Sequence, residues 1–414
     1  MELHETKNEE TIVLLAGLDL GESDTGESME ELRELARTAG ATVAGVITQK
    51  RPSPEPATCV GSGCLNDMAE FCRNNDVNLI IFDRELSPVQ MRNIEQATDV
   101  RTIDRTMLIL DIFAGRARSN EGKLQVELAQ LRYMLPRLTG KGIAMSRLGG
   151  GIGTRGPGES KLETDRRHIH RRIDALKEKL DEVARQRGRQ RERRKRDGII
   201  TVAIVGYTNA GKSTLLNALT DAGVLSEDML FATLDPTARA LELPSGSSVM
   251  LVDTVGFIRR LPHHLIEAFK STLEEAVQAD IILNVCDSSS PSFRDHLRIT
   301  NELLADLGVE NKPIITVMNK IDAADKDAVL GIDGVRISAK NREGFDALLS
   351  AIEDALPVKK VRACLLFPFS DIGASALVRE NGTIFSEEYT ADGLQMDCLI
   401  DSITAERLKK YYLQ

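Results

Sequence analysis

Short apolar runs alternate with amphipathic segments at the start of the chain. Three runs rich in branched residues are separated by helix-like patterns, the runs at 11–15, 41–47 and 77–82 and the patterns at 29–39 and 88–97. Runs of this length and composition are typical of buried strands, and their alternation with helices predicts a mostly parallel sheet covered by helices. Residues 1–115 are therefore expected to form an α/β domain.

The pattern changes over 116–197, where two apolar stripes recur at helical spacing, the second about every seven residues. They consist of Leu124, Leu128, Leu131 and Leu135, and of Leu162, Ile169, Ile173, Leu176, Leu180 and Val183. They predict two amphipathic helices, the first ended by Pro136, that pack as an antiparallel hairpin. The glycine-rich loop between them, 149–158, can contact RNA phosphates or a nucleotide, or only connect the helices.

Strand-like and helical patterns alternate again over 198–357 and predict a second α/β domain. Three of its apolar runs end in or lead into polar motifs, at 199–205, 249–253 and 313–318. The last segment, 358–414, contains two strand-like runs, an Asn-Gly hairpin signal at 381–382, and Ser402, which can cap a terminal helix. We expect a small C-terminal α/β domain that serves for docking.

The net charge of −10 hides an asymmetry along the 414 residues. Lys and Arg minus Asp and Glu gives +12 for 116–197, against −11 for 1–115, −10 for 198–357 and −1 for 358–414. The basic block ends at 185–196 with eight basic residues and one acidic. Such a segment is either a solvated helix face or an RNA contact, and we favour RNA because the flanking domains are acidic.

The remaining composition limits the class of protein. No run approaches the ~20 apolar residues of a membrane span, and the acidic amino terminus is unlike a secretory signal. The six cysteines form no C-x-x-C pair and lie mostly in apolar runs, which favours buried free thiols over disulfides or a zinc site. We expect a soluble, cytoplasmic monomer with no membrane span.

The most specific stretch is 206–213, which follows the apolar run 199–205 and leads into a helical pattern. A strand, a glycine turn and a helix in this order are typical of a P-loop, whose N–H groups cradle phosphates. Lys212 would reach the β- and γ-phosphates, and the Ser213 hydroxyl would ligate Mg²⁺. The predicted phosphate-binding residues are Gly206, Tyr207, Thr208, Asn209, Ala210, Gly211, Lys212, Ser213 and Thr214.

Two segments downstream have the composition of switches. Asp253 ends an apolar run and is placed to hold Mg²⁺ through its water shell, while Gly256 can offer an N–H to a γ-phosphate. Thr233 can complete the Mg²⁺ shell when the γ-phosphate is present, and a segment that responds in this way is a switch. The predicted nucleotide-contacting residues here are Phe231, Ala232, Thr233, Leu234 and Asp235, then Asp253, Thr254, Val255 and Gly256.

Two further motifs select the base. The Asp322 carboxylate can accept two hydrogen bonds from guanine, whereas adenine offers no matching pair. The loop at 338–340 is placed to pack on the base, with the Ala339 N–H free to reach the guanine oxygen. The predicted base-binding residues are Asn319, Lys320, Ile321 and Asp322, then Ser338, Ala339 and Lys340. Together the motifs predict a Mg²⁺-dependent GTPase with GTP as substrate.

These motifs resemble those of the HflX family of translation-associated GTPases, at 206–213, 231–237, 253–258, 319–322 and 338–340, and outside the GTPase segment at 122–130, 156–160 and 163–167. The resemblance covers nearly the whole chain. It implies a multidomain α/β protein, in which a P-loop GTPase domain follows a parallel α/β domain with a long helical hairpin and precedes a small α/β domain.

The resemblance also implies a function. Family members bind the large ribosomal subunit, split stalled or idle ribosomes, and hydrolyse GTP faster when bound there. Their N-terminal domain and hairpin lie near the ribosome's catalytic centre, which would give the basic arm an rRNA partner. Some are reported to bind or hydrolyse ATP through the N-terminal domain. Here Cys64 stands where a lysine is expected, in the turn 61–64, which puts a second nucleotide site in doubt.

The motifs do not identify the group that orients the attacking water. In many GTPases a glutamine after the Asp-x-x-Gly sequence orients the attacking water, but here that residue is Phe257. We therefore expect slow intrinsic hydrolysis, accelerated by a group from the ribosome, by a switch rearrangement, or by K⁺ held through Asn209. Two alternatives to ribosome splitting remain, a GTP-dependent switch acting on a non-ribosomal protein and an ATP-dependent RNA-remodelling activity of the N-terminal domain.

Overall fold

The structure is a computed structural model. It describes residues 10–21, 25–138, 161–196, 198–220, 230–231, 237–259, 270–309, 312–325, 331–357 and 360–413. These divide into two compact units. The first unit comprises the described residues up to 188 together with 230–231, 258–259 and 270–271, and the second comprises the rest.

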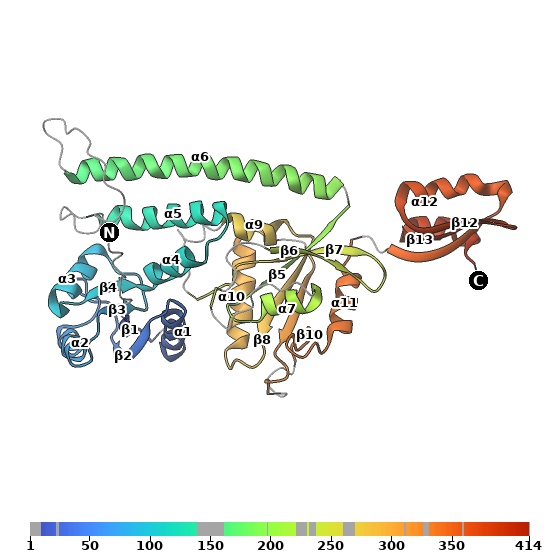
Figure 1. Ribbon diagram of the computed structural model, residues 1–414. Helices are drawn as coiled ribbons and strands as arrows, with labels where there is room; N and C mark the ends of the chain where they lie inside the picture. Colours follow the sequence, from blue (N-terminus) through green and yellow to red (C-terminus); the bar gives the residue numbers. More distant parts are fainter. Residues whose placement is uncertain are drawn as a thin grey trace, which may run out of the picture. The chain divides into compact units, whose positions relative to one another are not determined.

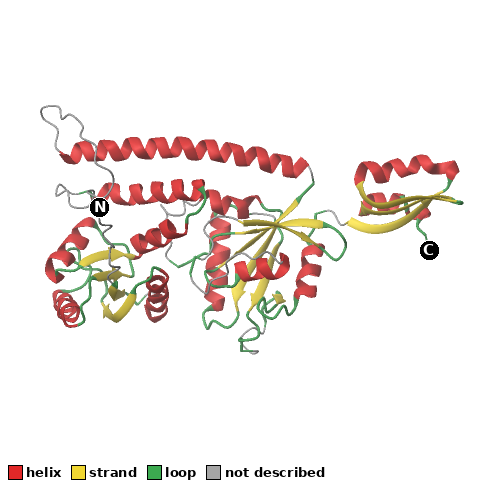
Figure 2. Cartoon of the chain, viewed as in Figure 1, coloured by secondary structure: helices red, strands yellow, loops and turns green. Residues whose placement is uncertain are grey.

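The first unit begins with a parallel four-stranded sheet in the order β2-β1-β3-β4. Its elements are β1 (Ile12–Asp19), α1 (Thr25–Thr38), β2 (Thr42–Lys50), α2 (Ser62–Asn74), β3 (Leu79–Phe82), α3 (Pro88–Thr98), β4 (Arg101–Asp104) and α4 (Arg105–Arg116). Helices cover both faces of the sheet, as Figures 1 and 2 show. The predicted α/β architecture is therefore confirmed.

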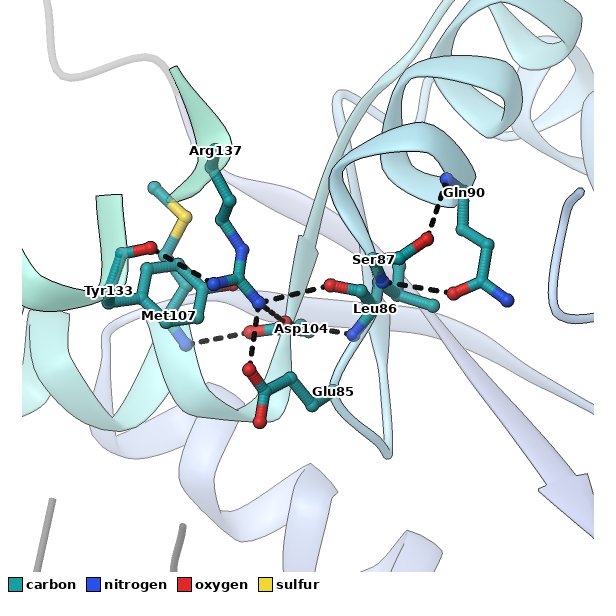
Figure 3. A network of polar contacts seen from close by, with 8 residues as sticks. All are labelled: Glu85, Leu86, Ser87, Gln90, Asp104, Met107, Tyr133 and Arg137. Atoms are coloured by element: carbon teal, nitrogen blue, oxygen red, sulfur yellow. Dashed lines mark hydrogen bonds and ion pairs between the residues drawn. The ribbon is translucent and has the colours of Figure 1, made fainter. Parts of the chain in front are cut away.

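A polar network centred on one buried carboxylate joins this sheet to the hairpin that follows (Figure 3). Asp104, at the end of β4, is fully buried and accepts a hydrogen bond from the Leu86 N–H at 3.1 Å. The Arg137 guanidinium donates to the Leu86 carbonyl at 3.0 Å and to Glu85 at 2.9 Å, and stacks on the Tyr133 ring. Burial raises the pKa of Asp104, opposed by hydrogen bonds from Tyr133 and the backbone and by the Arg137 charge. Because a buried carboxylate needs partners, this network fixes the end of the hairpin's first helix on the sheet.

The hairpin consists of α5 (Asn120–Met134), the 3₁₀ turn η1 (Leu135–Arg137) and α6 (Lys161–Arg196). The predicted stripes meet in one core that contains Leu128, Ile169, Ile173 and Leu176, flanked by Leu124, Leu131, Leu135, Leu138 and Leu180. Figure 1 shows α6 lying along α5, so the predicted hairpin is confirmed. The glycine-rich loop, 149–158, lies outside the described residues.

The second unit contains a six-stranded sheet in the order β10-β9-β8-β5-β7-β6, in which only β6 is antiparallel to its neighbour. Helices α7 and α11 share a core with one face, and α10 packs on the other. The elements are β5 (Ile200–Gly206), α7 (Lys212–Thr220), β6 (Thr237–Glu242), β7 (Ser248–Asp253), α9 (Lys270–Gln278), β8 (Ile281–Asp287), α10 (Phe293–Asp306), β9 (Ile314–Asn319), β10 (Val335–Arg336) and α11 (Phe345–Asp354).

The C-terminal part of this unit is a three-stranded antiparallel sheet in the order β11-β13-β12. Its elements are β11 (Lys360–Phe367), η2 (Phe369–Ser375), α12 (Ala376–Asn381), β12 (Gly382–Thr390), β13 (Gly393–Asp401), α13 (Ser402–Arg407) and η3 (Lys409–Tyr411). The predicted hairpin turn at 381–382 is wrong, because Asn381 ends a helix and the β12–β13 turn lies at 391–392. A side chain at Gly382 would come within 2.8 Å of the Val378 carbonyl, so close packing explains this glycine. Asp401, and not Ser402, caps α13.

No helix in the described ranges is long and apolar enough to cross a membrane. All six cysteines are free, four of them buried and two half-buried. Burial raises the pKa of the Cys72 thiol to about 11, which is typical of an unreactive core cysteine.

Candidate nucleotide-binding site

The predicted motifs of the second unit meet at one edge of its sheet. β5 ends at Gly206, β7 at Asp253 and β9 at Asn319, and the three strands run parallel with β8. Parallel strands bring their carboxyl ends together, and ligands of such sheets bind outside those ends. The sheet order therefore assembles a single candidate site from motifs that are far apart in the sequence.

The P-loop runs from the end of β5 to the start of α7. Asn209 is exposed and has a left-handed backbone with φ 61°, while Tyr207, Thr208 and Ala210 are buried. The Lys212 ammonium donates to the Tyr207 carbonyl at 2.8 Å, and its side chain is almost fully buried. Burial lowers the pKa of Lys212 to about 8, with the Asp253 charge opposing the shift. An anion bound in the loop would offset this cost of burying the ammonium.

The predicted Mg²⁺ ligands of the P-loop and of β7 are in contact. The Ser213 hydroxyl donates to Asp253 Oδ2 at 2.7 Å, and Asp253 is fully buried. A hydroxyl and a carboxylate are the oxygen ligands that Mg²⁺ takes in phosphate sites, so this pair fits the ion. The third predicted ligand, Thr233, lies outside the described residues with Ala232, Leu234 and Asp235, and their roles stay predictions.

Asn319 connects the P-loop to the loop at 338–340. Its amide nitrogen donates to the Ala210 carbonyl at 2.8 Å, and its oxygen accepts from the Ala339 N–H at 2.9 Å. In this structure the Ala339 N–H is therefore engaged by Asn319, and its contact with the guanine oxygen stays a prediction. Both ends of the Asn319 side chain are occupied in holding two loops of the site together.

Asp322 is exposed and oriented by a neighbour. The Ser338 hydroxyl donates to its Oδ1 at 2.6 Å, and this hydrogen bond is the main cause that holds the pKa of Asp322 below its usual value. A carboxylate with a lowered pKa is ionised at neutral pH, which is the form that the predicted recognition of two guanine donors needs. Lys320 forms an ion pair with Asp287 at 2.7 Å. Sequence reasoning missed Asp287, although it ends the β8 run in the way that Asp253 ends β7.

Three further predicted residues, Thr254, Phe257 and Phe231, are held by contacts within the protein. The Thr254 hydroxyl donates to the Ile204 carbonyl at 2.8 Å, and Phe257 is 1% exposed, so its ring is enclosed by protein. Phe231 belongs to the first unit, where its ring packs edge-on against Phe113 at 4.7 Å. Sequence reasoning also missed His296 of α10, whose ring stacks on Tyr207.

Three family models match the chain in succession. They are described as GTP-binding GTPase N-terminal over residues 26–114, GTP-binding GTPase Middle Region over 116–194, and 50S ribosome-binding GTPase over 201–320. Among solved structures, a GTP-binding protein from the hyperthermophilic archaeon Sulfolobus solfataricus in complex with GDP is 27% identical, with coverage of 83% of this chain and 98% of its own and a TM-score of 0.45.

Proteins named GTPase HflX are similar over nearly the full length. The one from Lacrimispora saccharolytica is 50% identical over 406 residues, which cover 97% of this chain and 96% of its own. The one from Caldanaerobacter subterraneus is 49% identical over 407 residues, with coverage of 98% and 95%. Such identity over the whole length shows the family directly, and this chain belongs to the HflX family of GTPases.

Proposed function

We propose that this GTPase binds the large ribosomal subunit, splits stalled or idle ribosomes, and hydrolyses GTP faster when it is bound there. Mg²⁺ is held by Ser213, Thr233 and, through water, Asp253, and K⁺ held through Asn209 can assist hydrolysis. The parts that we assign to this work are 1–115, the basic hairpin 116–197, the GTPase domain 198–357 and the docking domain 358–414. The matched description of a 50S ribosome-binding GTPase supports the partner.

The observation that carries the RNA contact is the division of the arginines of α6 between two faces. Arg187 forms an ion pair with Glu121 at 2.7 Å, and Arg191 forms one with Glu275 at 3.0 Å. Arg194 Nη1 lies 3.5 Å from Met250 Sδ. These three arginines recur at spacings of four and three, so they share one helix face and turn it toward the protein.

Four other arginines form an outward stripe, which consists of Arg185, Arg189, Arg193 and Arg196. All four are exposed, and their spacings of four, four and three place them on the face opposite the inward arginines. At 1.5 Å per residue the stripe spans roughly 16 Å. A row of this kind matches successive RNA phosphates, and the release of their counterions favours binding.

Cosedimentation and subunit-splitting assays test the function. Ribosomes are incubated with the protein and GTP, GDP or a non-hydrolysable GTP analogue, and the subunits are separated on gradients. We expect binding and splitting with GTP and with the analogue, because the γ-phosphate and not its hydrolysis orders the switch segments. Splitting that is as effective with GDP as with GTP would contradict a γ-phosphate-dependent factor.

The outward stripe is tested by changing its four arginines to glutamine together. Each phosphate contact contributes about 0.7–0.9 to the slope of log affinity against log salt, so we expect the slope for the large subunit to fall by about 3. The control variant makes the same charge change at exposed arginines outside α6 and outside the docking domain, namely Arg239, Arg294, Arg298 and Arg336. An equal loss of slope in both variants would show that only net charge matters.

A further inference from the structure

An aromatic pair links the P-loop to a helix that carries none of the nucleotide motifs. Tyr207, the second residue of the P-loop, is 5% exposed. Its ring stacks on the imidazole of His296 in α10, with centroids 3.9 Å apart and planes within 10° of parallel. Both rings therefore overlap face to face, and the contact fixes the tilt as well as the position of the Tyr207 ring.

The backbone around Tyr207 holds two parts of the site. Its carbonyl accepts the hydrogen bond from the Lys212 ammonium at 2.8 Å. On one side of it the Gly206 carbonyl accepts from the Phe257 N–H at 3.0 Å, and on the other the Thr208 N–H donates to the Phe257 carbonyl at 2.8 Å. A shift of Tyr207 would thus move both the phosphate-binding lysine and Phe257, which directly follows the second switch segment, 253–256.

The second switch segment, 253–256, packs tightly against the P-loop. A Cβ at Gly256 would lie 2.8 Å from Thr208 Cγ2 and 2.9 Å from Lys212 Nζ, which is closer than real side chains come. The Gly256 backbone, which we expect to bind the γ-phosphate, therefore packs directly on the residues that Tyr207 positions. A displacement of Tyr207 by a few tenths of an ångström would therefore also displace the Gly256 backbone.

We infer that His296 is a positioning residue for nucleotide binding and hydrolysis, which acts by holding Tyr207. Helix α10 does not need His296 in order to dock, because Phe293, Thr300 and Leu304 are each at most 3% exposed and anchor it in the core. The imidazole itself is half-buried and lies against the P-loop residue Tyr207. Removal of the imidazole should therefore affect nucleotide binding and hydrolysis more than the stability of the fold.

The test compares His296→Ala, which removes the stacked ring, with His296→Phe, which keeps one. An aromatic pair of this kind contributes a factor of about two to ten, so His296→Ala should release GDP about two- to tenfold faster and lower kcat for GTP by a similar factor. His296→Phe should restore both values. Stopped-flow release of a fluorescent GDP and steady-state hydrolysis at saturating GTP measure them.

Two comparisons separate positioning from a general effect on the fold. Arg298→Ala changes an exposed residue of the same helix and should leave both rates at the parent values. In the Tyr207→Leu background, His296→Ala should have no further effect, since the ring that it holds is gone. The inference is overturned if His296→Ala keeps the parent rates, or if His296→Phe is as impaired as His296→Ala.

Discussion

Asp322→Asn should lower the affinity for GTP by about 10²- to 10³-fold and allow the protein to bind xanthosine triphosphate. In the predicted site the ionised carboxylate would accept two hydrogen bonds from guanine, and each charge-assisted bond of this kind contributes roughly 1.5–3 kcal/mol. Asparagine replaces one acceptor by an N–H donor, which faces the exocyclic amine of guanine but matches the 2-oxo group of xanthine. The base preference should therefore change, while phosphate binding stays intact.

The geometry makes this substitution a clean test. Asp322 is exposed, and its hydrogen bond from Ser338 can be kept by the asparagine oxygen, so the fold of the base loop should survive. Equilibrium titrations with fluorescent GTP and xanthosine triphosphate give the two affinities. Asp333→Asn, at an exposed carboxylate of the same unit, is the control and should leave both unchanged. Parent-like GTP affinity in Asp322→Asn would show that this residue does not read the base.

Local patterns predicted most of the architecture. The runs that became β1, β2, β3, β5, β7 and β9 are apolar and continuous, and the leucine stripe of α5 meets the seam of α6 as expected. β4 gave little signal because it has only four residues and contains Arg101 and Asp104. Asn381 and Gly382 misled us, since the same two residues serve equally well at the junction of a helix and a strand.

Contacts between distant residues were beyond the reach of pattern reasoning. The sequence showed eight basic residues at 185–196, but only the packing of α6 shows that Arg187 and Arg191 face carboxylates and Arg185 and Arg189 face outward. The stacking of Tyr207 on His296 is equally invisible, because no local spacing relates the two residues. Motifs thus identify the groups that a ligand needs, whereas tertiary packing decides which neighbours hold them.

Lys212→Met should weaken nucleotide binding by about 10³-fold and at the same time stabilise the nucleotide-free protein. The ammonium would contact two phosphates, and charge-assisted hydrogen bonds contribute roughly 1.5–3 kcal/mol each. In the nucleotide-free protein the same ammonium destabilises the fold, since burial lowers its pKa from 10.5 to about 8. At roughly 1.4 kcal/mol per pKa unit, this lowering corresponds to about 3 kcal/mol of lost folding stability. Methionine is similar in length and apolar, so the substitution should recover about 1–3 kcal/mol of it.

Opposite signs in the two measurements distinguish this account from a general loss of structure. Urea unfolding without nucleotide should give Lys212→Met a higher free energy of unfolding than the parent, and titration with fluorescent GDP should give it a far weaker affinity. Added GDP should raise the unfolding midpoint of the parent and leave that of Lys212→Met nearly unchanged, because stabilisation by a ligand follows its affinity. Lys123→Met, at an exposed lysine of α5, should behave as the parent in all three measurements. A Lys212→Met protein that is both less stable and weakly binding would contradict this account. It would mean that the lysine stabilises the nucleotide-free loop, whereas we expect its buried ammonium to destabilise the protein until nucleotide binds.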